Sequence, residues 1–200
     1  MIVAIVNHKG GVGKSVTAIH LAAYFQQSAP ALLIDGDRNR SCLSWQRRGA
    51  LPFRVIDERQ AGGIAQDYKY VVIDTPAAER DDLAALAKGC DLLVIPAIPD
   101  AMSLDALVLL VDELRQIGAA RFKVLLTLCP PRPSHDADEA RAMLDSAGIP
   151  VFTGQIRRLA AYQKAALAGV IVSAVHDPRA AAAWNDYAAI GKEITKNHGR

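Results

Sequence analysis

The run Lys9-Gly10-Gly11-Val12-Gly13-Lys14-Ser15 follows an apolar segment over residues 2–6 and precedes a helical pattern that begins at residue 14. Glycines at three of four consecutive positions allow the backbone to turn tightly and to point successive N–H groups at one anion. Lys14 adds a cation for the β- and γ-phosphates of a nucleotide, and Ser15 offers a hydroxyl group to Mg²⁺. The following helix directs its positive dipole end at the same anion. The sequence therefore predicts a phosphate-binding loop.

This loop departs from the strict pattern Gly-x-x-x-x-Gly-Lys-Ser/Thr, because the first glycine of that pattern would fall at His8. A second lysine, Lys9, stands at the start of the loop instead. The alternative interpretation is a glycine-rich turn that only joins a strand to a helix. Strand, loop, Lys-Ser pair and amphipathic helix occur in the order that phosphate binding requires, and this order favours the phosphate-binding loop.

The rest of the chain alternates short apolar runs with segments of helical length. The predicted strands are residues 2–6, 31–35, 70–74, 91–95 and 123–128, which have the near-continuous apolar character of strands buried on both faces of a parallel sheet. The predicted helices are residues 14–28, 103–117, 135–147 and 178–197. We expect an α/β fold with a doubly wound, mostly parallel sheet and helices on both faces. In such a fold, ligands bind beyond the carboxyl ends of the strands.

Carboxylates follow two of the predicted strands, at the edge where ligands are expected. Asp35 and Asp37 lie at the end of the second run, and Asp74 ends the run Val71-Val72-Ile73-Asp74. An aspartate after several apolar residues, in a chain that already has a phosphate-binding loop, is typical of a carboxylate that binds Mg²⁺, usually through water. A charged turn that caps the next helix is the alternative for Asp35 and Asp37.

The motif Lys-Gly-Gly-Val-Gly-Lys-Ser resembles the deviant Walker A motif of the ParA/MinD family of P-loop ATPases, and the resemblance extends over the whole chain. Its length and motif order resemble those of the small ParA proteins, which include the ParF plasmid-partition and McdA carboxysome-positioning types. The resemblance implies binding of ATP and ADP with Mg²⁺ by the loop from Lys9 to Val16. It also implies that Lys9 reaches across an ATP-sandwich homodimer to the phosphates of the partner.

The resemblance assigns the remaining site residues as well. Asp37 would orient the attacking water and reach the Mg²⁺ shell, so that Asp37, Lys9 and Lys14 form the catalytic set. Ser15, Asp35, Asp37 and Asp74 would surround the metal, and the loop at Pro130 would lie against the adenine. Arg38 replaces the proline that usually follows this aspartate in the family, which leaves the conformation of that loop and the hydrolysis rate open.

The composition is that of one ordinary globular domain over residues 1–200, with a formal net charge of +2. The three cysteines have no Cys-x-x-Cys spacing, so neither a disulfide framework nor a zinc ribbon is predicted, and reduced thiols in the cytoplasm fit best. The first residues lack a basic segment and lead directly into the glycine-rich turn, which argues against a signal peptide. The apolar runs are too short for a membrane span.

Basic residues gather in the last quarter of the chain, where seven lysines and arginines stand against three acids in residues 151–200. Lys192, Lys196 and Arg200 are spaced to share one face of a final helix, and Arg157, Arg158 and Lys164 form a second candidate patch. We expect these residues to bind double-stranded DNA without sequence preference through its phosphates. A solvated helix face is the alternative.

These features predict a cytoplasmic, nucleoid-associated ATPase that partitions or positions a plasmid, a chromosome region or a carboxysome-like compartment. A ParB-like or McdB-like adaptor would stimulate hydrolysis. The main alternative is a membrane-associated regulator like MinD, but residues 185–200 contain few large apolar side chains for a membrane anchor. A metal-cluster carrier of the nitrogenase iron-protein kind would need converging cysteines, and Cys90 and Cys129 lack the matching context.

Overall fold

The computed structural model describes residues 1–76 and 80–198 of the chain. Its centre is a six-stranded sheet in the order β3-β2-β4-β1-β5-β6, and every pairing in it is parallel. The strands are β1 (Ile2–Ile5), β2 (Ala31–Asp35), β3 (Arg54–Asp57), β4 (Tyr70–Asp74), β5 (Leu92–Ala97) and β6 (Phe122–Leu126). From β1 the chain first winds towards β3 and then returns to build the other half of the sheet, so the predicted doubly wound α/β fold is confirmed.

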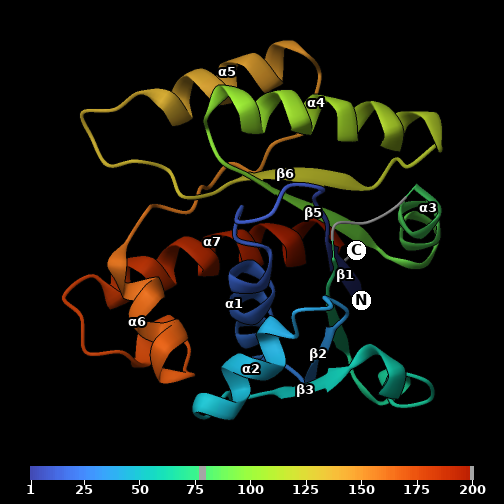
Figure 1. Ribbon diagram of the computed structural model, residues 1–200, viewed down its shortest axis with the longest axis vertical. Helices are drawn as coiled ribbons and strands as arrows, with labels where there is room; N and C mark the ends of the chain where they lie inside the picture. Colours follow the sequence, from blue (N-terminus) through green and yellow to red (C-terminus); the bar gives the residue numbers. More distant parts are fainter. Residues whose placement is uncertain (77–79, 199–200) are drawn as a thin grey trace.

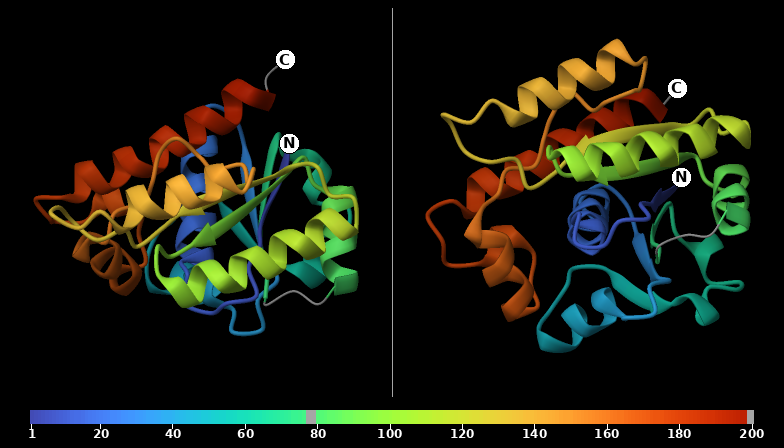
Figure 2. Two further views of the ribbon diagram at one scale, coloured as in Figure 1. Left: turned by 90° about the horizontal axis from the view of Figure 1, so that it is seen from above. Right: turned by 45° about the horizontal axis from the view of Figure 1, so that its top comes forward.

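Helices cover both faces of this sheet (Figure 1). They are α1 (Lys14–Gln26), α2 (Ser41–Arg48), α3 (Arg80–Gly89), α4 (Ala101–Gln116), α5 (Asp136–Ser146), α6 (Ala160–Ala168) and α7 (Ala180–His198). One large apolar cluster joins α1, α2, α6 and α7 to the sheet, and a second joins α3, α4 and α5 to the opposite face. Figure 2 shows the same division from two further directions.

The structure contains one strand and three helices that the sequence patterns did not predict. β3 is an edge strand in which only Val55 and Ile56 are buried, too short a run to stand out. α2, α3 and α6 were not predicted either, and of these α6 is rich in alanine and packs beside α2 and α7. The predicted strand over 91–95 begins one residue later and extends to Ala97.

The phosphate-loop helix α1 packs closely against α7. Gly191 on α7 allows this approach, because a Cβ atom there would lie 2.2 Å from Cδ1 of Tyr24. Thr17 and Tyr187 also join the two helices, with 3.1 Å between their hydroxyl oxygens. The close contact holds the start of α1 rigidly against the C-terminal half of the domain.

A fully buried histidine, His20, lies at the centre of this contact. Its Nδ1 atom is 2.7 Å from the Val16 carbonyl oxygen, and its Nε2 atom accepts the backbone N–H of Val172 at 3.0 Å. The carbonyl can only accept, so the ring carries its proton on Nδ1. The imidazole stacks on Tyr187 with 4.9 Å between ring centroids. Burial lowers the pKa of His20 to about 4, and the bond to Val16 opposes this shift.

Among the described residues, no helix combines the length and the apolar character that crossing a membrane requires. The N-terminus and the last turn of α7 lie near each other, at the edge of the sheet opposite the loop that joins β1 to α1 (Figures 1 and 2).

Candidate functional site

The predicted phosphate loop joins the carboxyl end of β1 to the first turn of α1. Gly11 and Gly13 have φ angles of 76° and 90°, in the left-handed region that side chains other than glycine rarely adopt. A Cβ atom on Gly10 or Gly11 would meet nothing within 4 Å, so the outer surface of the loop is open. Val12 is instead fully buried and anchors the loop to the core. The glycine side of the loop therefore borders an open space.

The side chain of Lys14 lies inside the loop, and the residue is 8% exposed. Its Nζ atom donates hydrogen bonds to the carbonyl oxygens of Asn7 and Lys9, each at 3.1 Å. Burial lowers the pKa of Lys14, while the charges of Asp74 and Asp37 oppose this shift. A cavity of about 340 Å³ begins at this ammonium group and is lined by Gly10, Gly11, Gly13, Lys14, Ser15, Val16, Asp37, Asn39 and Ser41. Most of the residues predicted to hold the nucleotide phosphates thus converge on one space.

Lys9 points away from that space. Its Nζ atom lies 3.5 Å from Oδ1 of Asp100, the residue that caps α4 by accepting the backbone N–H of Ser103. Next to it, His8 contacts Glu113 of α4 at 2.9 Å. The start of the loop is therefore turned towards α4, and Lys9 is available outside its own phosphate cradle.

Two buried aspartates face each other at the carboxyl edge of the sheet. Asp35 ends β2, Asp74 ends β4, and the two are register partners in the parallel pairing of these strands. Both are 0% exposed. Asp35 accepts the backbone N–H of Leu43 at 2.9 Å, but one oxygen of each carboxylate has no hydrogen-bond partner. The fold thus holds two carboxylates in a position where each retains an unused acceptor.

Burial raises the pKa of Asp35, and it raises the pKa of Asp74 to about 6. Hydrogen bonds from Ser15 and Cys42 oppose the shift at Asp74, and the charge of Asp35 adds to it. Two buried acids with unused oxygens beside a serine hydroxyl fit a hard divalent cation, because such ions prefer oxygen ligands and would neutralise the pair. The donor set of Ser15, Asp35 and Asp74 is therefore compatible with the predicted Mg²⁺.

Asp37 lies at the rim of the cradle and is half-buried. Its Oδ1 atom accepts the backbone N–H of Asn39 at 2.9 Å. It also lines a second cavity of about 420 Å³, which shares Gly10, Lys14, Asp37 and Asn39 with the first and adds Arg38, Pro76 and Asp82. Asp37 is thus positioned between the phosphate cradle and an open space beside it.

Two residues of this region were not singled out from the sequence. Arg40 adopts a left-handed conformation with φ of 50°, and its guanidinium contacts Asp57 at 3.1 Å and donates to the Asp35 carbonyl at 2.6 Å. This arginine holds the loop that carries Arg38 in place. Cys42 donates its thiol to Asp74 at 3.2 Å, and its pKa is raised by burial. Arg40 could have been noticed in the sequence because it closely follows Asp35 and Asp37, with which a basic side chain can pair. A single cysteine such as Cys42 gives no comparable indication.

The five predicted DNA-binding residues that the structure describes lie in two separate places. Arg157 and Lys164 are held by acids, at 2.7 Å from Asp186 and 2.7 Å from Asp177 respectively. Arg158 is exposed and makes no ion pair with the described residues. Lys192 and Lys196 are exposed near the end of α7, and Arg200 lies outside the described residues.

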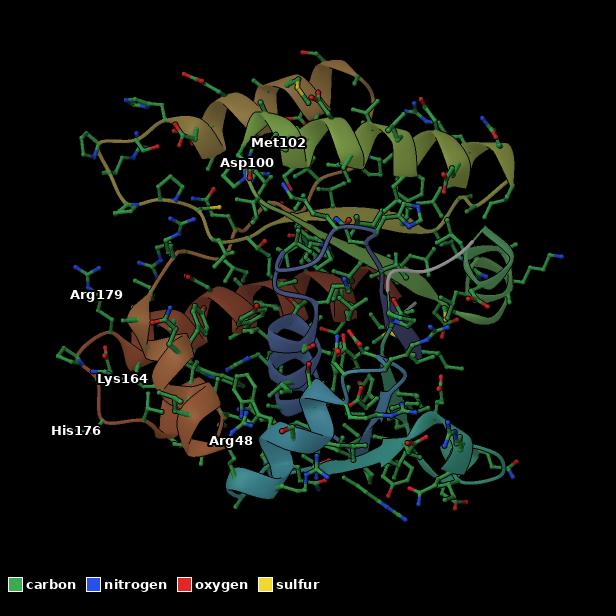
Figure 3. The ribbon with its side chains drawn as sticks, viewed as in Figure 1. Arg48, Asp100, Met102, Lys164, His176 and Arg179 are labelled. Atoms are coloured by element: carbon green, nitrogen blue, oxygen red, sulfur yellow. The ribbon has the colours of Figure 1, made fainter. Side chains whose placement is uncertain are left out.

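The structure brings further basic side chains to the region around α6. Arg48 of α2 donates to the Ala166 carbonyl at 2.8 Å, which brings the end of α2 against α6. Figure 3 shows Arg48, Lys164, His176 and Arg179 on this side of the molecule. These residues come from distant parts of the sequence, so the sequence pattern does not group them.

Pro130 is half-buried in the loop that follows β6, after Leu128 with φ of 51° and the buried Cys129. It does not line either of the two cavities at the cradle. Its predicted contact with adenine remains an expectation.

Comparison with known proteins agrees with this arrangement. Residues 3–189 match the family described as the CobQ/CobB/MinD/ParA nucleotide binding domain. The chain is 35% identical to maintenance of carboxysome distribution protein A from Gloeobacter kilaueensis, over 98% of this chain and 94% of that protein.

Among solved structures, a putative plasmid partition protein from Borrelia burgdorferi bound to AMPPNP has a TM-score of 0.77 at 17% identity, over 98% of both chains. An ATP complex of McdA from Cyanothece has a TM-score of 0.72 at 19% identity, over 99% of this chain and 96% of that one. At these identities the two structures support the fold alone. The family match over residues 3–189 and the relative with 35% identity show that this chain belongs to the ParA/MinD family of P-loop nucleotide-binding proteins.

Proposed function

We propose that this protein is a Mg²⁺-dependent ATP hydrolase that positions or partitions an intracellular cargo. The observation that carries the proposal is the open cradle lined by Lys14, Ser15 and Asp37. The buried Asp35–Asp74 pair lies directly behind it, with Asp74 in contact with Ser15. A relative with 35% identity is named for carboxysome distribution, which makes a carboxysome-like compartment the first cargo to consider. Plasmids and chromosome regions are the other candidates.

In the proposed reaction, the loop N–H groups and Lys14 bind the β- and γ-phosphates. Lys14 leaves the carbonyl oxygens of Asn7 and Lys9 and donates to phosphate oxygens instead, which replaces neutral acceptors by charged ones. Mg²⁺, when bound near Ser15, Asp35 and Asp74, would supply charge neutralisation for the phosphates. Asp37 accepts a hydrogen bond from the attacking water and orients it, since phosphoryl transfer depends mainly on positioning and charge stabilisation.

Lys9 is proposed to act in the partner subunit of an ATP-dependent homodimer. Within its own subunit, Lys14 already serves the cradle and Lys9 points towards Asp100. Arrival of a second subunit on the nucleotide face would offer Lys9 a phosphate in place of this partly exposed ion pair. ATP then closes the dimer, and hydrolysis opens it.

DNA binding without sequence preference is proposed for the basic side chains of the C-terminal quarter. Arg158, Lys192 and Lys196 are exposed and unpaired among the described residues, so their charges are free for phosphates. Arg157 and Lys164 are already neutralised by acids and should contribute less. Arg179 is exposed on the side of α6 and extends the proposed surface.

Dimerisation would double these contacts and make DNA affinity depend on ATP. We further propose that the protein works in the cytoplasm on the nucleoid, and that a ParB-like or McdB-like adaptor links it to the cargo and stimulates hydrolysis.

The direct test combines three measurements on the wild-type protein and on Asp37→Ala. ATP hydrolysis is measured by phosphate release, mass in solution by light scattering, and binding to unrelated DNA duplexes by anisotropy at several salt concentrations. We expect Asp37→Ala to bind ATP, to hydrolyse it slowly and to accumulate as a DNA-bound dimer. Failure of the wild-type protein to hydrolyse ATP would refute the enzymatic assignment, and equal DNA binding with ATP and ADP would refute the switch.

A further inference from the structure

A thiol stands beside the two buried carboxylates at the end of the sheet. The Sγ atom of Cys42 lies 3.2 Å from Oδ2 of Asp74, and Asp35, Cys42 and Asp74 offer ligand atoms that all lie within 4.8 Å of one another. All three residues are fully buried. Within residues 1–76 and 80–198, no other three histidine, cysteine or acidic side chains come together in this way. The fold therefore gathers two oxygen donors and one sulfur donor in one enclosed place.

The two carboxylates keep acceptor capacity that the protein does not use. Oδ1 of Asp35 and Oδ1 of Asp74 are buried and have no hydrogen-bond partner. The contact with Cys42 involves Oδ2 of Asp74 and leaves this atom unsatisfied. A buried acceptor without a partner costs free energy because it has lost its water. A cation bound between the three side chains would satisfy both oxygens at once.

The first turn of α2 fixes the thiol in this place. Asp35 accepts the backbone N–H of Leu43 at 2.9 Å, which ties the start of α2 to the end of β2. The Sγ atom of Cys42 also lies 4.0 Å from the Ser15 carbonyl oxygen, at the start of α1. The thiol is thus held between the phosphate loop and the strand-end acids by the backbone of α2.

The other two cysteines of the chain have different surroundings. Cys90 and Cys129 are buried in the apolar cluster that joins α3, α4 and α5 to the sheet, and neither belongs to a group of possible metal ligands. A buried cysteine usually serves as a small apolar side chain, and these two fit that description. Cys42 differs from them in its two carboxylate neighbours.

The mixed donor set selects among divalent ions. Mg²⁺ takes oxygen ligands in octahedral geometry and keeps several waters, so a thiol adds nothing to its binding. Zn²⁺ takes cysteine sulfur together with aspartate oxygen at about 2.0–2.3 Å, which places the atoms of a tetrahedral set about 3.3–3.8 Å apart. The separation of 3.2 Å between Cys42 and Asp74 is close to this spacing. Small side-chain movements would bring the third ligand to it.

We propose that Asp35, Cys42 and Asp74 form a binding site for a thiophilic divalent cation, and that Zn²⁺ is the ion this ligand set fits. On binding, the S–H bond of Cys42 breaks, the thiolate coordinates the ion and the proton leaves to solvent. Three protein ligands leave the fourth position of a tetrahedral ion open to water. The cradle cavity, lined by Ser15 and Ser41, gives the ion its route to the site.

This site would compete with the nucleotide-bound Mg²⁺. Both ions need the carboxylates of Asp35 and Asp74, and two dications cannot share them at this distance without strong repulsion. Bound Zn²⁺ therefore keeps the acids from Mg²⁺ and inhibits ATP hydrolysis. The inhibition rests on the proposed function and deepens it with a regulatory ion, whereas binding of the ion does not depend on it.

The first test uses Co²⁺, which takes the place of Zn²⁺ in tetrahedral sites and gives a near-ultraviolet charge-transfer band when a thiolate is a ligand. The band is recorded on the nucleotide-free wild-type protein, on Cys42→Ser and on Cys42→Ala. We expect it in the wild type and its loss in both variants, with circular dichroism spectra unchanged in at least one of them. Absence of the band in the wild type, or its persistence in a folded variant, would overturn the proposal.

Zinc affinity gives a second readout, measured by competition with a chromophoric chelator. The wild type should bind one ion with a dissociation constant of about 10 μM or tighter, and Cys42→Ser should weaken binding at least about tenfold. Cys90→Ser is the matched control, because it removes a buried thiol that has no carboxylate pair, and should stay within about twofold of wild type. Equal weakening in both serine variants would contradict a site at Cys42.

The third measurement is phosphate release from Mg·ATP at buffered concentrations of free Zn²⁺. Each protein is compared with its own rate without Zn²⁺, and the zinc–ATP complex in solution is the same for all of them. Half-inhibition of Cys42→Ser should need at least about tenfold more Zn²⁺ than half-inhibition of wild type or Cys90→Ser. Equal inhibition of all three would overturn the regulatory role.

The outcomes separate the two proposals. If the wild type does not hydrolyse ATP, the proposed function fails while the cobalt spectrum and the zinc affinity still judge the ion site. If hydrolysis is normal and no cobalt–thiolate band forms, only the ion site fails.

Discussion

Acidification should destabilise the protein through His20 by an amount that the structure allows to be worked out. The folded state holds this imidazole neutral, with its pKa lowered to about 4 by burial, whereas the unfolded chain has the ordinary value near 6.5. The unfolded state therefore binds more protons between these values, and stability contributed by neutral His20 is lost as the pH falls. The full pKa difference between the unfolded and folded states corresponds to about 3 kcal/mol of unfolding free energy. About 2 kcal/mol of this should be lost between pH 7 and pH 5.

Asp74 acts in the opposite direction, because its pKa is raised to about 6 by burial, so the folded state takes up a proton there as the pH falls. The two effects partly cancel in the wild type. The measurement is therefore a difference: urea unfolding of wild type and His20→Gln at pH 5, 6 and 7. The variant loses the Nδ1–H group that donates to the Val16 carbonyl and the ring that stacks on Tyr187, and should be less stable by about 1–3 kcal/mol at pH 7.

The stability gap between wild type and His20→Gln should narrow by about 2 kcal/mol at pH 5. His176→Gln removes an exposed histidine and serves as the control, with stability at pH 7 within about 0.5 kcal/mol of wild type. If His20→Gln does not fold, a proton NMR titration of the wild type replaces it, and the His20 ring signals should stay unchanged down to pH 5. The reasoning would be refuted if the unfolding free energies of wild type and His20→Gln changed in parallel with pH, or if the His20 signal titrated near pH 6.5.

Three further outcomes are expected. Lys14→Ala should reduce ATP affinity at least about tenfold by calorimetry with an unchanged circular dichroism spectrum, because it removes the cation of the cradle; unchanged affinity would contradict the site. Gly191→Ala should lower the free energy of unfolding by about 1–3 kcal/mol, because its Cβ atom meets Tyr24, whereas Lys192→Ala beside it should be nearly neutral. Arg179→Glu should weaken DNA binding at low salt without changing ATP affinity; equal effects on both would point to damage of the fold.

The sheet and the cradle were largely predictable from the sequence because both depend on local signals. Fully buried strands leave continuous apolar runs, and a loop that must adopt positive φ angles leaves glycines such as Gly11 and Gly13. β3 was missed because an edge strand with two buried residues has almost no pattern. The strand-end aspartates were found because each follows an apolar run.

The remaining features depend on contacts between distant segments. Cys42 reaches Asp74 across 32 positions, and Lys123 reaches Glu193 across 70. The ion pair between Arg157 and Asp186 likewise forms only because α7 packs beside the loop that contains Arg157. Residue types along the chain indicate charge, but not which charges the fold has already paired.

The bond between Lys14 and the Lys9 carbonyl has a mechanical consequence. The ammonium group that first meets a nucleotide is tied to the backbone of the residue proposed to reach the other subunit. When Lys14 turns to a bound phosphate, this hydrogen bond breaks. The backbone at the start of the loop then becomes more mobile, in the nucleotide-bound state that would recruit the second subunit. The segment whose mobility would change is the loop from Lys9 to Lys14, which this one hydrogen bond closes. A rise in picosecond-to-nanosecond backbone motion at the Lys9 amide on nucleotide binding, measured by nitrogen relaxation, is the expected signature, and unchanged order there would exclude such a relay.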